Sequence, residues 1–267
     1  MLSLGKKIRL SRLFDSPTGR TLVLTIDQGL ARGVMPGIED ARKTISMLVE
    51  GRPNAITMHK GLAQQCFYEH AGKVSLIMKC TTFSEFHPNY DAWVSSVEDA
   101  VRLGADAIAM GVLVGGERQA EMLANLGKLA REAEQAGMPL ITHIYPKGEL
   151  ISREHQYDLA NIAFAARAGA ELGADVVKTW YTGSPDTFAK VVEACPAKVV
   201  VAGGPKLDDP RQVLRVVRDV MDAGAAGLAF GRNVWQYERP LAMIRALKVL
   251  VHEDGTLEQA EAELERR

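Results

Sequence analysis

Glycine separates polar helical stretches from short apolar runs at intervals along the whole chain. Glycine suits the left-handed position that closes a helix, and it is common just past a helix end. The runs that follow carry little polar alternation, as in parallel strands covered on both faces. We therefore predict repeated helix–strand units, most clearly at RLGADAIAM (102–110), QAGMPLITH (135–143), ELGADVVKT (171–179) and DAGAAGLAF (222–230).

Eight such runs qualify as strands, and helical segments such as 117–137 and 209–224 fall between nearly all of them. Strand–helix alternation favours parallel βαβ units, and eight units match the closed (β/α)₈ barrel, the TIM barrel of the α/β class. A doubly wound open sheet is the alternative, but it would want a GxGxxG first turn, and the first strand instead runs into DQGLARG. The predicted strands are 21–27, 54–60, 74–80, 106–112, 139–146, 175–179, 198–204 and 227–233.

No linker or low-complexity tract divides the chain, so we expect one domain over 1–267. A short N-terminal extension (about 1–20) and a helical C-terminal tail (about 253–267) flank the barrel. The formal net charge of −1 gives no bulk attraction to nucleic acid or to an anionic membrane. Three cysteines without a CxxC pair favour a reducing, cytoplasmic location, and we find neither a signal peptide nor a membrane span.

Polar side chains gather where the predicted strands end. In barrels of this kind the chemistry lies at the C-terminal ends of the strands, whereas residues within the strands pack the core. His143 and Tyr145 are two residues apart and therefore share one face of their strand. Such placement at one rim indicates an active site built from Asp27, His59, Lys60, Lys79, His143, Tyr145 and Lys178.

The last two strands end in glycines beside cations. Turns at these positions often bind phosphate through backbone N–H groups and a nearby helix N-terminus. VAGGPK supplies Gly203 and Gly204 with Lys206 close by, and AFGRN supplies Gly231 and Arg232. Arginine is well shaped for bidentate contact with phosphate. A pair of merely tight turns is the alternative to the phosphate site that we predict here.

Lys178 ends the apolar run of GADVVKTWYTGS. A nucleophilic lysine needs its pKa lowered by roughly 3 units from about 10.4, through burial or a nearby cation. Burial in a barrel mouth, with Lys60 or Lys79 as the cation, would allow Lys178 to form a Schiff base with a ketone. Tyr145 or Asp27 could then move the protons. The alternative is a structural ion pair between Lys178 and Asp27, and Lys60 or Lys79 could themselves be the reactive amine.

A metal-dependent lyase is a rival interpretation, because His59, His143 and Asp27 all stand at predicted strand ends. The chain lacks HxH or HxxxE ligand spacing, so we expect no metal. Trp180 either packs the core or lines the barrel mouth.

The motifs GADVVKTWYTGS, IYPKG, VVVAGGPK, GAAGLAFGRN and TIDQG resemble those of the archaeal-type class I fructose-bisphosphate aldolases. They equally resemble the related transaldolase 2-amino-3,7-dideoxy-D-threo-hept-6-ulosonate synthase, and the likeness runs from about residue 20 to 252 in the family's order. The resemblance implies a Schiff base on Lys178, general acid–base catalysis by Tyr145 and proton transfer assisted by Asp27. It also implies that Gly203, Gly204, Gly231 and Arg232 hold the substrate phosphate, with no cofactor.

Three departures from the family motifs concern the substrate. Gln28 stands where the family's DHG motif has histidine, Arg32-Gly33-Val34 replaces His-Gly-Pro, and His143 replaces an aromatic residue of the fructose-bisphosphate aldolases. We place Gln28 and His143 among the substrate-binding residues. The segments DQGLARGVMPG and MHKGL look closer to the transaldolase and to autoinducer-processing relatives.

The sequence thus predicts a metal-independent, Schiff-base aldolase that acts on a phosphorylated ketose and releases or takes up an aldehyde. A transaldolase of the two related types is the alternative. A barrel that binds phosphosugars without catalysis is a further one. Because exposed helices of such barrels often associate, we also expect a homo-oligomer.

Overall fold

Parallel strands close into a barrel in the computed structural model, which describes residues 2–266. The strand order is β1-β10-β9-β8-β7-β6-β3-β2, with β2 returning to β1. Every predicted strand is present, so the closed (β/α)₈ barrel is confirmed and the open sheet is excluded. The barrel strands are β1 (Thr21–Thr25), β2 (Ala55–His59), β3 (Ser75–Lys79), β6 (Ala107–Val114), β7 (Leu140–Pro146), β8 (Val176–Thr179), β9 (Lys198–Ala202) and β10 (Gly227–Phe230).

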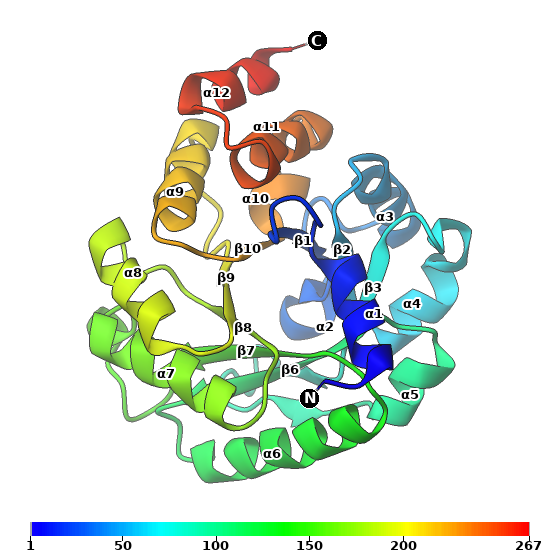
Figure 1. The fold of residues 1–267 in the computed structure, drawn as a ribbon, viewed down its shortest axis with the longest axis vertical. Helices are drawn as coiled ribbons and strands as arrows, with labels where there is room; N and C mark the ends of the chain where they lie inside the picture. Colours follow the sequence, from blue (N-terminus) through cyan, green and yellow to red (C-terminus); the bar gives the residue numbers. More distant parts are fainter. Residues whose placement is uncertain (1, 267) are drawn as a thin grey trace.

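Helices surround the barrel in chain order (Figure 1). The predicted junction glycines close them in the left-handed region: Gly104 has φ 69° and Gly173 has φ 98°. Gly137 and Gly224 behave alike, with φ 60° and 88°. The surrounding helices are α3 (Ala41–Glu50), α4 (Lys60–Cys66), α5 (Val97–Arg102), α6 (Gln119–Gln135), α7 (Leu159–Glu171), α8 (Pro185–Ala194), α9 (Pro210–Asp222) and α11 (Pro240–His252), with the short α2 (Gln28–Arg32) and α10 (Arg232–Trp235) and the 3₁₀ turns η1 (Tyr68–His70) and η2 (Arg153–His155).

The N-terminal extension forms a helix, α1 (Leu4–Leu13), which lies across one end of the barrel (Figure 1). Leu13 and Phe14 pack against the inward side chains of the strands, among them Val23 and Ile141. A buried ion pair of 2.9 Å between Lys6 and Asp175 holds the helix in place. This end of the barrel is therefore sealed, and the opposite end is the open one.

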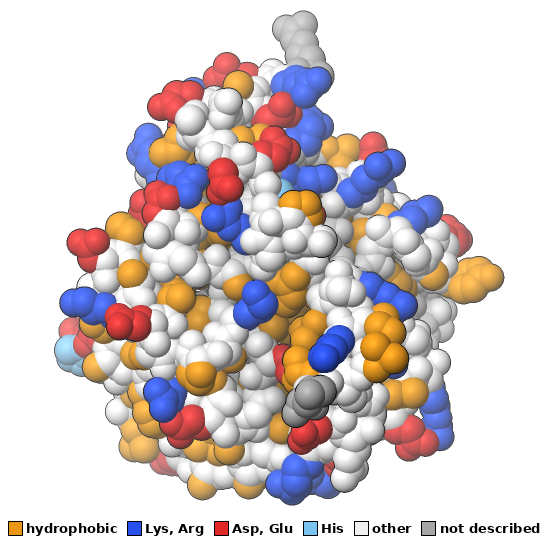
Figure 2. Space-filling model, in the orientation of Figure 1, with side chains coloured by type: hydrophobic (Ala, Val, Ile, Leu, Met, Phe, Trp, Pro, Cys, Tyr) orange, Lys and Arg blue, Asp and Glu red, His pale blue; other side chains and the backbone are white. Residues whose placement is uncertain are grey.

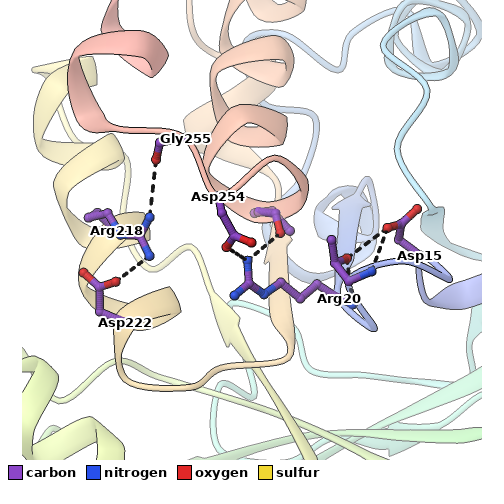
Figure 3. A network of polar contacts seen from close by, with 8 residues as sticks. Asp15, Arg20, Arg218, Asp222, Asp254 and Gly255 are labelled. Carbon is purple, nitrogen blue, oxygen red and sulfur yellow. Dashed lines mark hydrogen bonds and ion pairs between the residues drawn. The ribbon is translucent and has the colours of Figure 1, made fainter.

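The C-terminal tail is also a helix, α12 (Leu257–Glu265), which packs on α11 and α9. Figure 3 shows two arginines at its base. Arg20 donates to the Asp254 carboxylate and to the Val251 carbonyl, and Arg218 donates to the Gly255 carbonyl. These contacts attach the turn between α11 and α12 to the start of β1 and to α9.

Figure 2 shows the sealed end as a mixture of acidic and basic side chains, with apolar side chains beside α1. Leu4 and Ile8 are exposed on that helix. None of the helices within residues 2–266 is both long and apolar enough to cross a membrane.

An antiparallel hairpin that the sequence pattern did not predict follows β3. It pairs β4 (Thr81–Thr82) with β5 (Ala92–Trp93). The hairpin matters for the site because it brings Asp91 to the open end of the barrel.

Candidate active site

Strand alternation directs the predicted site residues into the barrel. On β7, Ile141 belongs to the inner core cluster, so His143 and Tyr145, two and four residues on, face the same way. On β8, Val176 points into the barrel, and Lys178, two residues on, points the same way. His143 and Lys178 are partners in the register of the two strands. Both lie on a cavity of about 430 Å³ at the open end, which is also lined by Asp27 and Tyr145.

Lys178 is 6% exposed and contacts the cavity. Burial lowers the pKa of its ammonium to about 8; the Asp27 carboxylate opposes this shift and the Lys79 ammonium adds to it. Across residues 2–266 Lys178 forms no ion pair with Asp27, so the structural pairing that the sequence left open is absent. At a pKa of about 8, about a tenth of the amine is uncharged at pH 7, against less than about a thousandth at its usual pKa.

Tyr145 forms one wall of the cavity together with Trp180. Their rings stack with centroids 4.7 Å apart, and the Tyr157 ring also stacks on Trp180, with a centroid distance of 5.1 Å. Trp180 thus lines the barrel mouth. Burial raises the pKa of the Tyr145 phenol, so it remains protonated and can donate a hydrogen bond or a proton.

Two histidines contribute neutral imidazoles to the floor of the cavity. Burial lowers the pKa of His143 well below its usual value, and the Lys178 ammonium adds to this effect. Burial likewise lowers the pKa of His59, whose Nδ1 lies 3.1 Å from the Lys79 carbonyl oxygen. Although both line the cavity with Asp27, no three His, Cys, Asp or Glu side chains in the described part of the chain are arranged to hold a metal ion.

Lys79 is held by a buried network instead of acting as a free amine. Its Nζ donates to the Thr81 hydroxyl and carbonyl, both at 2.8 Å, and to Asp91 Oδ1 at 3.1 Å. The Lys60 ammonium donates to Asp99 at 2.6 Å, and neither residue lines the cavity. Of the three candidate lysines, Lys178 is the one that faces the cavity without a carboxylate partner. The sequence analysis did not identify Asp91, because this residue lies in a loop and not at the end of a predicted strand.

The two glycine-bearing turns lie side by side on the cavity. Arg232 donates to the Gly204 carbonyl at 2.6 Å. Asn233, which the sequence did not single out, donates to the carbonyls of Gly203 and Pro205 at 2.7 and 3.1 Å. Gly203, Gly204, Gly231, Arg232 and Asn233 all line the cavity. The structure leaves Lys206 exposed and outside the cavity lining.

Gln28 lies between the turns and β1. Its Nε2 donates to Thr25 Oγ1 at 2.8 Å, and its buried Oε1 has no hydrogen-bond partner within residues 2–266. A Cβ on Gly231 would lie 2.5 Å from Gln28 Nε2, so the glycine leaves room for this side chain. Gln28 therefore reaches the cavity beside the Gly203–Gly204 and Gly231–Arg232 turns, which we call the phosphate-type turns.

Further cations line the rim of the cavity. Arg32 and Lys147 each lie 5.4 Å from the centroid of the Phe83 ring, and all three residues line the cavity. Burial lowers the pKa of Lys147, and the positive charges of Arg32 and Arg153 add to this effect. A second anionic group would be stabilised there.

A parallel barrel with a buried lysine of lowered pKa at its open end is the arrangement of a Schiff-base aldolase. A model of the DeoC/LacD family of aldolases matches residues 21–237, and the chain belongs to this family. The resemblance drawn from the motifs is therefore confirmed at the level of the family.

Two curated relatives and one solved structure illustrate the likeness. The 2-amino-3,7-dideoxy-D-threo-hept-6-ulosonate synthase of Halobacterium salinarum is 34% identical over 97% of this chain and 96% of the relative. The 2-amino-4,5-dihydroxy-6-oxo-7-(phosphonooxy)heptanoate synthase of Streptomyces griseus is 34% identical over 97% and 94%. The structure of a Schiff-base-forming fructose-1,6-bisphosphate aldolase is 30% identical over 92% of this chain and 100% of that one, with a TM-score of 0.85.

Proposed function

We propose that this aldolase forms its Schiff base on Lys178 and makes or breaks a carbon–carbon bond in a phosphorylated ketose. The observation that carries the proposal is the position of the Lys178 amine. It is buried, has no ion-pair partner among the described residues, and lies on the same cavity as the Gly203–Gly204 and Gly231–Arg232 turns. The turns hold the phosphate, and the ketone carbon then lies near the amine.

The chemistry follows from these side chains. The uncharged amine attacks the ketone carbon, and the carbinolamine loses its hydroxyl as water with a proton from the Tyr145 phenol. The resulting iminium accepts the electron pair of the adjacent carbon–carbon bond while a base removes the proton of the β-hydroxyl. Asp27 lines the same cavity and is the carboxylate base that we assign to this step. The aldehyde leaves, and protonation and hydrolysis of the enamine regenerate Lys178.

The nature of the second fragment separates the candidate activities. Fructose 1,6-bisphosphate has a phosphate at each end. The name of the Streptomyces relative describes a ketone next to a phosphate-bearing carbon, two hydroxyls, an amino group and a carboxylate. Cleavage of such a compound between carbons 4 and 5 leaves dihydroxyacetone phosphate and 2-amino-4-oxobutanoate. Arg32 and Lys147 suit the second anion in either case.

Trapping with borohydride tests the proposal. Reduction in the presence of dihydroxyacetone phosphate should inactivate the wild type and attach the substrate to the peptide that contains Lys178. The Lys178→Met variant should resist, and Lys60→Met should react like the wild type because Lys60 lies outside the cavity. Modification elsewhere, or none at all, contradicts the assignment.

The same variant tests the non-catalytic alternative. If the protein only bound phosphosugars, the Lys178→Met variant would bind its ligand almost as tightly as the wild type, because only one charge contact is lost. The wild type itself would then show no turnover.

A further inference from the structure

Asp91 is a buried carboxylate that the proposed steps do not use. It is 4% exposed and enters the cavity from the end of the hairpin loop, next to β5. Its Oδ1 accepts from Lys79 Nζ at 3.1 Å and from Thr81 Oγ1 at 2.7 Å. Thr81 Oγ1 in turn accepts from the Gly111 backbone N–H at 2.7 Å. Two side chains and one strand therefore fix this single carboxylate in place.

Gly111 makes the space for the carboxylate. A Cβ at this position would lie 2.4 Å from Cγ, Oδ1 and Oδ2 of Asp91. Glycine in the middle of a strand weakens the strand, and it marks a place where another group must approach closely. The preceding inward residues of β6, Ala107 and Ala109, are small as well. The barrel wall is thus hollowed where Asp91 lies.

The second oxygen of Asp91 remains available. Oδ2 receives no hydrogen bond from residues 2–266. It is not one of the fully buried polar atoms without a hydrogen bond, so part of this oxygen is accessible. Because Asp91 lines the cavity, Oδ2 borders the space that a ligand would occupy.

The barrel order shows which part of a ligand would reach this oxygen. Strands β3 and β6, which flank Asp91, lie across the barrel from β9 and β10, which carry the phosphate-type turns. Lys178 on β8 lies beside the turns. A ketose held by its phosphate at the turns and by its ketone at Lys178 can therefore extend its remaining carbons across the cavity towards Asp91.

We propose that Asp91 recognises a hydrogen-bond donor, a hydroxyl or an ammonium group, on the aldehyde fragment beyond the bond that is made or broken. The proposal rests on the proposed function, because it takes Lys178 as the reactive amine. Asp91 is then a specificity-determining residue: aldehydes that carry such a donor are favoured over analogues of the same length that lack it.

Synthesis with dihydroxyacetone phosphate and matched aldehydes tests the proposal. D-glyceraldehyde is compared with propionaldehyde for the hydroxyl, and 2-amino-4-oxobutanoate with 4-oxobutanoate for the ammonium group. The wild type should prefer the donor-bearing member of at least one pair by about tenfold or more in kcat/KM, the usual effect of a hydrogen bond to a charged group. The pair that shows the preference identifies the donor.

The Asp91→Asn variant should reduce that preference to about twofold. The preference is a ratio of two kcat/KM values measured on one variant, so an effect on Lys178 through Lys79 cancels from it. Asp99→Asn is the matched control, since it breaks the Lys60–Asp99 pair outside the cavity and should leave the preference intact.

If Asp91→Asn lowered kcat/KM equally for both aldehydes of a pair, Asp91 would only hold Lys79 in place and would not recognise the donor. If that variant does not fold, the wild-type preference decides, and its absence in both pairs overturns the proposal. Failure of the proposed function is distinct, because the wild type would then not be trapped by borohydride at all.

Discussion

Replacing Lys178 by methionine should stabilise the protein while abolishing turnover. The pKa of this lysine falls from 10.5 to about 8 on folding because the charged form is desolvated. At about 1.4 kcal/mol per pKa unit, holding the ammonium in its folded site at pH 7 costs about 3 kcal/mol. Methionine fills a similar volume and carries no charge, so the variant should regain about this free energy of unfolding. In a chain of this size that corresponds to a rise in Tm on the order of 5–10 °C.

The stability difference between Lys178→Met and the wild type should depend on pH, and the direction follows from the pKa shift. Between the folded pKa of about 8 and the unfolded value of about 10.5, the unfolded chain binds more protons at Lys178 than the folded chain does. The stability of the wild type therefore rises with pH across this window relative to the variant. The advantage of Lys178→Met should be full below pH 8 and should vanish towards pH 10.5.

Urea unfolding followed by circular dichroism at pH 7 and at pH 10 measures this difference. Lys190→Met, at an exposed position on α8, is the control and should change stability little at either pH. A Lys178→Met protein that is less stable than the wild type at pH 7, or equally shifted at both pH values, would refute the reasoning from burial.

Two further changes test the substrate turns and the barrel closure. Arg232→Met should raise KM for a phosphorylated ketose by about tenfold to a hundredfold, since a hydrogen bond to a charged group contributes about 1.5–3 kcal/mol; steady-state kinetics check this, and an equal effect on an unphosphorylated ketose would contradict it. Gly227→Ala should lower the free energy of unfolding by about 3 kcal/mol or more, because its Cβ would lie 1.9 Å from the Thr21 carbonyl oxygen where β10 joins β1. Gly61→Ala, with no atom within 4 Å of the added Cβ, should be neutral or stabilising in the same urea assay, and a similar loss in both variants would contradict the steric argument.

The barrel was predictable because its signals are local. A helix that ends at Gly104 or Gly173 needs the left-handed conformation, and that requirement is visible in a single residue. That His143 and Tyr145 share one face of their strand also follows from their spacing alone. Strand ends therefore placed Asp27, Tyr145 and Lys178 on one rim before any tertiary contact was known.

The rest of the site depends on contacts between distant residues. Asp91 acquires its place from Thr81 and from Gly111, and neither a periodic pattern nor a strand end marks it in the sequence. The role predicted for Lys206 also depends on tertiary structure, and it stays a prediction. Its nearness to Gly203 and Gly204 suggested a phosphate contact, but the turn at Gly204, with φ 63°, is followed by exposed residues, and the lysine lies outside the cavity.

The electrostatics of the cavity suit both charge states that the proposed reaction requires of Lys178. Before reaction, burial and the Lys79 ammonium favour the neutral amine, while the Asp27 carboxylate opposes them. The iminium that follows carries a positive charge, so the same carboxylate then stabilises it without any rearrangement of the protein. Lys79 is itself paired with Asp91, and this pairing limits the repulsion between the Lys79 ammonium and the iminium. Because burial is the largest effect on the pKa of the free Lys178 amine, the Asp27 carboxylate only partly offsets the shift towards the neutral form. The same carboxylate can then stabilise the iminium.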